Sequence, residues 1–116
     1  MKLQSIPINY RHWMLVIWLL ALLIGSLLPL SGSPSIQHGD KIQHFIGYAV
    51  LAILIFRVRT RVGLAFALAT TFGVLIEFAQ GLTPWRSFDP ADMLANALGA
   101  LLGLSVWYWC SRRKID

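Results

Sequence analysis

The stretch from Val62 to Leu82, which reads VGLAFALATTFGVLIEFAQGL, decides the fold class of this chain. Its 21 residues include a single ionisable side chain, that of Glu77. A helix of about 20 apolar residues is long enough to cross the roughly 30 Å of hydrocarbon in a bilayer. The stretch therefore predicts a membrane-spanning helix, and a carboxylate inside such a helix is a candidate functional residue.

Three further apolar segments have a similar character, namely Trp13 to Leu30, Ile42 to Phe56 and Ala91 to Cys110. The second is short for a span, so we expect it to extend into its flanks, from about residue 40 to residue 58. A chain of 116 residues has room for one domain. The sequence thus predicts a single all-α membrane domain, residues 1–116, with four transmembrane helices over about 13–30, 40–58, 62–82 and 91–110.

The first apolar segment has an alternative interpretation as a cleaved signal peptide, because Lys2 and Arg11 precede it. Against this, the segment is long for a signal-peptide core, and no small-x-small cleavage pattern closes it before Pro29. A membrane-spanning helix is therefore the favoured interpretation.

The basic residues predict the orientation in the membrane. One side of the bundle carries the eight bases Lys2, Arg11, Arg57, Arg59, Arg61, Arg112, Arg113 and Lys114, and the other side carries two, Lys41 and Arg86. Because basic segments stay in the cytoplasm, both termini are predicted to be cytoplasmic. The net charge of +5 is thus gathered at the ends of apolar runs, which argues against a continuous nucleic-acid-binding face.

Composition excludes several other classes. The hydrophobic fraction is 57% and the charged fraction 13%, about half the charge usual in soluble domains. The single cysteine, Cys110, can form no internal disulfide, and no Cys/His spacing typical of a zinc site is present. No cofactor is indicated. The five tryptophans and Tyr108 are expected to act mostly as anchors of the helices at the membrane interfaces; the tryptophans are Trp13, Trp18, Trp85, Trp107 and Trp109.

Polar residues within the spans fall on three helix faces, because residues three or four apart share a face. They are Asp40, His44 and Tyr48 on the second helix, Gly73, Glu77 and Gln80 on the third, and Asp92, Asn96, Gly99 and Gly103 on the fourth. The GxxxG spacing of Gly99 and Gly103 predicts a close contact with another helix. Asp89 or Asp92 is available to cap the fourth helix.

Counting from the inner basic residues predicts that three of these side chains share a layer. At about 1.5 Å per residue, His44 lies about 20 Å above Arg57, while Glu77 and Asn96 lie about 24 Å above the inner boundary. A rim of six polar residues is expected just above that layer, near the outer face: Asp40, Lys41, Gln80, Arg86, Asp89 and Asp92.

This layer permits several kinds of chemistry. Glu77 and His44 are candidates for an acid/base pair, and Arg86 and Lys41 for the recognition of a phosphate or carboxylate at the level of the lipid headgroups. A structural role, in which the same polar groups hold the helices together, has comparable weight. A divalent metal held by His44, Glu77 and Asp92 is a weaker alternative, since their spacing is not diagnostic, and no metal ligand is assigned.

The same residues resemble the motifs of a known family. The run from Asp40 to Tyr48, DKIQHFIGY, is similar to the DKxxHFxxY stretch of the VanZ-like family, and Gly73 to Gln80, GVLIEFAQ, resembles its GxxxExxQ segment. The third element, with R, D, D, N and G in family order, is carried by Arg86, Asp89, Asp92, Asn96 and Gly99. The match runs from Asp40 to Gly103 in family order and spacing.

This resemblance implies a small multi-span protein of the bacterial cytoplasmic membrane, in a family whose namesake is linked to resistance to the glycopeptide teicoplanin. We expect an outer-facing polar pocket that binds, and in an enzymatic version modifies, an anionic lipid-linked or glycan-linked group. The expected partners are membrane lipids and a lipid-linked envelope precursor. The alternative is a non-catalytic accessory protein whose polar cluster is structural or forms a partner interface. The sequence specifies no oligomeric state.

Overall fold

The computed structural model describes residues 10–27, 39–84 and 89–115. They form four helices, α1 (Tyr10–Leu27), α2 (Gly39–Arg59), α3 (Val62–Gly81) and α4 (Pro90–Ile115). All four are long and apolar enough to cross a membrane, which confirms the predicted all-α, four-span fold class. The helix bounds differ slightly from the predicted ones, because α1 begins before residue 13 and α4 continues beyond residue 110. Residues 28–30 of the first predicted span lie outside the described residues.

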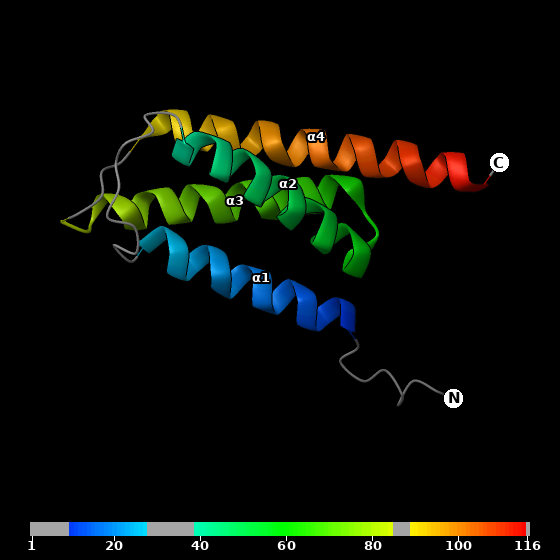
Figure 1. The fold of residues 1–116 in the computed structure, drawn as a ribbon, viewed down its shortest axis with the longest axis horizontal. Coiled ribbons are helices and arrows are strands. Elements are labelled where there is room, and N and C mark those ends of the chain that lie inside the picture. The colour runs from blue at the N-terminus through cyan, green and yellow to red at the C-terminus, as the bar shows by residue number, and fades with distance from the viewer. Residues whose placement is uncertain (1–9, 28–38, 85–88, 116) are drawn as a thin grey trace.

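The four helices run up and down in an antiparallel bundle (Figure 1). The start of α1, the α2–α3 turn and the end of α4 lie at one end, which we call the basic end because it carries Arg11, Arg57, Arg59, Arg61 and Arg112. The opposite end, where α2 and α4 begin, is called the polar end. Within the described residues, α2 contacts every other helix, whereas α1 contacts α2 and α3 but not α4. Helix α1 is thus the peripheral member of the bundle.

Local sequence explains where α2 ends and where α4 begins. Thr60, between α2 and α3, has a positive φ of 55°, and its N–H donates to the carbonyl of Phe56 at 2.6 Å, which ends α2 in a tight turn. At α4, Pro90 occupies the first helical position, where a missing N–H costs nothing. The Asp89 Oδ1 accepts the N–H of Ala91 at 3.0 Å. Asp89 is therefore the N-cap residue, one of the two predicted candidates.

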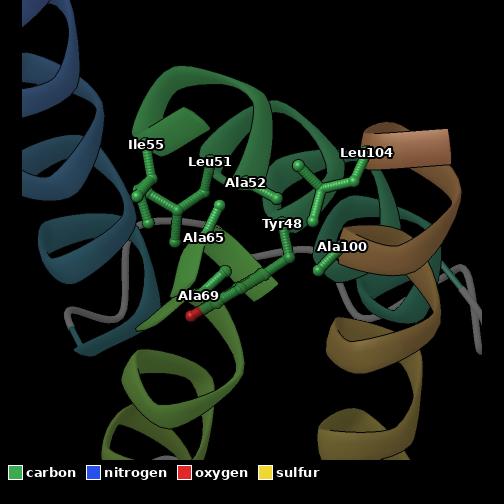
Figure 2. Packing of buried hydrophobic residues seen from close by; sticks show 8 residues of the cluster. All are labelled: Tyr48, Leu51, Ala52, Ile55, Ala65, Ala69, Ala100 and Leu104. Carbon is green, nitrogen blue, oxygen red and sulfur yellow. The ribbon is translucent and has the colours of Figure 1, made fainter. Parts of the chain in front are cut away.

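The apolar core lies between α2, α3 and α4 and is built largely from small side chains. Tyr48, Leu51, Ala52 and Ile55 of α2 meet Ala65 and Ala69 of α3, with Ala100 and Leu104 of α4 (Figure 2). Helices α2 and α4 lie in backbone contact at Gly99 and Gly103, whose α-carbons lie against the backbone of α2 at Phe45 and Ala49. The α2–α4 contact is thus a backbone-to-backbone contact that a side chain at either glycine would block.

Topology across the membrane yields the first testable prediction. In a Cys110→Ser background, cysteines placed at Ser33 and Ser87 should react with a membrane-impermeant thiol reagent added outside intact cells. Cysteines at Thr60 and Ser111, near the basic end, should react only after permeabilisation, because the basic end is predicted to be cytoplasmic. Outside labelling at Thr60 or Ser111 in intact cells would contradict this orientation.

Candidate functional site at the polar end

An ion-pair network joins α2 to the start of α4 at the polar end. The Lys41 ammonium lies 2.9 Å from Asp89 Oδ2 and 3.3 Å from Asp92 Oδ1. The hydrogen bond from Lys41, with a further bond from the Ala91 N–H, holds the pKa of the Asp89 carboxyl below its ordinary value. Lys41 and Asp89 remain partly exposed, whereas Asp92 is 4% exposed. The network therefore runs from the surface into the interior of the bundle.

His44 continues this network inward. Its Nδ1 lies 3.0 Å from Asn96 Oδ1 and its Nε2 lies 3.5 Å from Asp92 Oδ2. Both ring nitrogens of His44 therefore lie against polar atoms of α4, and the donor and acceptor roles in the contact with Asn96 depend on the tautomer of the ring.

The Glu77 carboxylate enters the same region from α3. Its side chain is fully buried, and its Oε2 accepts the N–H of Asp89 at 2.5 Å, which ties α3 to the start of α4. Glu77 lies within electrostatic reach of His44, Asp89 and Asp92. We call these six residues the polar cluster: Lys41, His44, Glu77, Asp89, Asp92 and Asn96.

Within the described part of the chain, several buried polar atoms of this region have no hydrogen-bond partner. They include Glu77 Oε1, Asn96 Nδ2 and the Tyr48 hydroxyl. An unpaired buried polar group is costly and calls for an explanation, such as a bound ligand or water. Glu77 Oε1 and Asn96 Nδ2 are consequently two atoms of the polar cluster whose hydrogen bonds a bound ligand or water would complete.

Gly73 makes room for these side chains on α3. A Cβ at Gly73 would lie 2.7 Å from Asn96 Nδ2 and 3.1 Å from the Tyr48 ring. The sequence predicts Gly73 as a helix-packing residue. In the structure it packs against side chains of the site, whereas Gly99 and Gly103 pack against helix backbone. Gly73 thus positions Asn96, and through it His44.

A cavity of about 140 Å³ borders the polar cluster on the side of α1. Its lining includes Gln43, His44 and Tyr48 of α2 and Gln80 of α3. The Gln80 amide donates to the carbonyl of Ser26 on α1 at 2.9 Å. Gln80 and Tyr48, both predicted as ligand-binding residues, therefore face this cavity, while Glu77, Asp92 and Asn96 lie outside its lining.

Not every predicted residue can be placed. Arg86 and the side chain of Asp40 lie outside the described residues, as does Trp85. For the weaker metal alternative, no three His, Cys, Asp or Glu side chains are grouped to hold a metal ion in the parts of the chain that the structure describes.

Sequence reasoning missed the contribution of α1 to this region. Trp18, predicted as an interface anchor, instead donates its indole N–H to the Gly47 carbonyl of α2 at 2.9 Å and is only partly exposed. Ser26 and Gln43 were not singled out either. The one signal for Trp18 is its position, several residues inside the apolar run, which is unusual for an interface residue.

Comparison with known proteins places the chain in a family. Residues 3–111 match the VanZ/LLP1 family, a span that covers all four helices apart from the last residues of α4. The chain is also similar to the uncharacterized protein C11E3.10 of Schizosaccharomyces pombe, at 28% identity over 112 residues, which cover 91% of this chain and 69% of that protein. No solved structure matches the chain. This protein therefore belongs to the VanZ/LLP1 family and is a multi-pass membrane protein.

Proposed function

We propose that this protein binds an anionic lipid-linked or glycan-linked group of the cell envelope at the polar end of its bundle. The observation that carries the proposal is the polar cluster, in which six polar side chains from three helices meet inside an otherwise apolar bundle and leave Glu77 Oε1 and Asn96 Nδ2 without partners among the described residues. Ionisable groups at membrane depth are costly and are functional by default. With the predicted orientation, the bound group lies in the outer leaflet.

Charge balance decides which residues would hold the anion. The described cluster carries three carboxylates, those of Glu77, Asp89 and Asp92, and Lys41 is already shared between two of them. An anion therefore needs a further base near the polar end. Arg86 precedes Asp89 by three residues in the chain, and its guanidinium can hold a phosphate or carboxylate with two parallel hydrogen bonds. Arg86 is thus the proposed primary ligand, assisted by Lys41.

In an enzymatic version, Glu77 is the general base. His44 suits that role less well because both of its ring nitrogens already lie against polar atoms of α4. Glu77 Oε2 is held by the Asp89 N–H, while Oε1 has no partner within the described residues and can take the proton of an attacking water or hydroxyl. Arg86 and Lys41 would neutralise the phosphate under attack, with Gln80 and Asn96 orienting it. As the new bond to phosphorus forms, the bond to the lipid or glycan oxygen breaks, and this leaving oxygen takes up the proton that Glu77 has accepted.

The comparisons favour a lipid-linked group over a peptidoglycan-specific one. Similarity to a yeast protein shows that chains like this one occur outside bacteria, so a ligand available in membranes of both kinds of organism fits best. Placement of this chain in a bacterial cytoplasmic membrane stays a prediction. An altered teicoplanin susceptibility would then be an indirect effect, because binding by this protein would change the envelope groups that the glycopeptide encounters.

The test of the proposal compares two arginine variants. Purified protein in phosphatidylcholine nanodiscs is titrated with glycerol phosphate, and the dissociation constant is measured by calorimetry for Arg86→Gln and Arg59→Gln. The first should bind about tenfold more weakly or worse, since it loses a charge-assisted bidentate contact. The second removes the same charge at the basic end and should match the wild type. Equal affinities in all three proteins would refute the role of Arg86.

A second candidate function has one observation in its favour. Most polar atoms of the cluster already pair with each other, and they tie α2 to α4 through Lys41, His44, Asp92 and Asn96. This arrangement suits an accessory protein whose cluster stabilises the bundle or a partner interface. In that case, variants of the cluster should lose function only to the extent that the substitution lowers the stability of the fold.

A further inference from the structure

The cavity beside the polar cluster is bounded on its outer side by α1, which packs less tightly than the other helices. No described residue of α1 is buried. Toward the basic end, α1 is held to α2 by the Trp18 hydrogen bond to the Gly47 carbonyl, and Leu22 packs on Gly47. Leu22 also lines the cavity, together with three small residues of α1, Ala21, Gly25 and Ser26. The small side chains leave space that larger ones would fill.

The mouth of the cavity lies on the side of the bundle. Three residues of its lining, Ala21 and Gly25 of α1 and Gln43 of α2, are exposed at the molecular surface. A Cβ at Gly25 would meet no atom within 4 Å. These residues belong to helices that are long and apolar enough to cross a membrane, and the flanking surface of α1 is apolar, with Leu20 51% and Ile24 48% exposed. The mouth consequently faces lipid.

The dimensions of the cavity restrict what enters it. A volume of about 140 Å³ is close to that of a cavity that holds one small ring. A phosphate-sized group fits, whereas a whole lipid does not, so most of its hydrocarbon chain must stay outside, against the exposed apolar flank of α1. The wall that such a group meets is polar, with the Gln43 amide, the His44 imidazole and the Gln80 amide.

We infer that the ligand of this protein is an amphipathic membrane lipid with a small anionic headgroup, which reaches the polar cluster sideways through the gap between α1 and α2. The headgroup passes through the cavity, along His44 and Gln80, to the polar cluster, and the hydrocarbon chain lies along α1. The inference rests on the proposed function and narrows it, because it selects a lipid over a soluble glycan. It also assigns α1 the role of a lateral opening.

The chain offers a matched pair of glycines to test this access route. Gly25 and Gly63 are both helical, and a Cβ at either meets nothing within 4 Å. Substitution of leucine for either glycine raises helix propensity. Gly25→Leu fills the mouth of the cavity, whereas Gly63→Leu adds the same side chain at the start of α3, at the basic end. Neither residue belongs to the polar cluster.

The experiment measures the contact with lipid and the binding of a soluble anion separately. Wild type and both variants are placed in phosphatidylcholine nanodiscs that contain a phosphatidic acid with a photoreactive diazirine on one acyl chain, and crosslinked sites are mapped by mass spectrometry. Wild type and Gly63→Leu should crosslink preferentially along residues 20–26 and at Gln43. In Gly25→Leu the yield at these sites should fall by about tenfold, because the added side chain fills the mouth of the cavity. Glycerol phosphate should bind all three proteins alike.

Two results would overturn the inference while leaving the proposed function intact. One is crosslinking spread evenly over the lipid-facing surfaces of all four helices, or unchanged in Gly25→Leu. The other is a loss of glycerol phosphate binding in Gly25→Leu equal to the loss of lipid crosslinking, which would make the cavity part of an aqueous route. If the wild type bound no glycerol phosphate, the proposed function would fail, and the crosslinking pattern would still decide whether lipid occupies the cavity.

Discussion

Gly99→Leu is expected to unfold the bundle or to prevent its assembly, with a loss of about 3 kcal/mol or more in the free energy of unfolding. Even a Cβ at this position would overlap the carbonyl oxygen of Phe45 and lie 2.9 Å from its carbonyl carbon. These are backbone atoms of α2, which cannot rotate away as a side chain can. The measurement is the Tm of the purified variant in detergent, followed by circular dichroism.

Gly63→Leu is the matched control for this variant. It adds the same side chain to a helical glycine, but a Cβ there meets nothing within 4 Å, so its Tm should stay close to the wild-type value. Gly103→Leu should resemble Gly99→Leu, because its Cβ would lie 2.5 Å from the Ala49 carbonyl oxygen. A wild-type Tm for Gly99→Leu would mean that α4 packs through a different face.

Much of the fold follows from the sequence because membrane-spanning helices are defined by length and hydrophobicity alone. Four apolar runs predict four spans, and the structure has them. The spacing of Gly99 and Gly103 predicts that some helix approaches closely, but it does not identify that helix as α2. Small residues indicate that another helix packs closely against them, but they do not indicate which helix it is.

The layer that contains the polar cluster could likewise be predicted by counting residues from the basic end, since a helix rises by a constant amount per residue. The count places His44, Glu77 and Asn96 at similar depths, and in the structure His44 contacts Asn96 directly. Counting does not give the rotation of each helix about its axis. That rotation depends on packing, and it is what sets Gly73 against Asn96 and Trp18 against Gly47.

The cavity beside α1 was beyond sequence reasoning for a related reason. Ala21, Gly25 and Ser26 are ordinary residues of an apolar helix, and nothing in their pattern distinguishes a face against lipid from a face against a gap. Only the position of α1 relative to Gln80 and His44 in the structure shows that these small side chains line a cavity.

Glu77→Gln is expected to abolish function while leaving the protein folded. The glutamine keeps the shape of the side chain, and its amide oxygen can still accept the Asp89 N–H that Glu77 Oε2 accepts now. It removes a charge whose second oxygen has no partner among the described residues, so the Tm should stay the same or rise. If Glu77 is a general base, the rate should fall by about 100-fold or more. The measurements are Tm in detergent and, in cells, teicoplanin sensitivity, which the wild-type protein is expected to alter if the proposed function holds.

Glu77→Asp is the control that separates charge from packing. It keeps a carboxylate but withdraws it by one methylene from the Asp89 N–H, so it should lower the Tm and retain part of the function. A cluster that only holds the helices together predicts the reverse order, with function following Tm in both variants, because the network between α3 and α4 is then all that matters. A less stable but partly active Glu77→Asp beside a stable, inactive Glu77→Gln would assign Glu77 to the ligand, because function would then follow the carboxylate and not the stability of the fold.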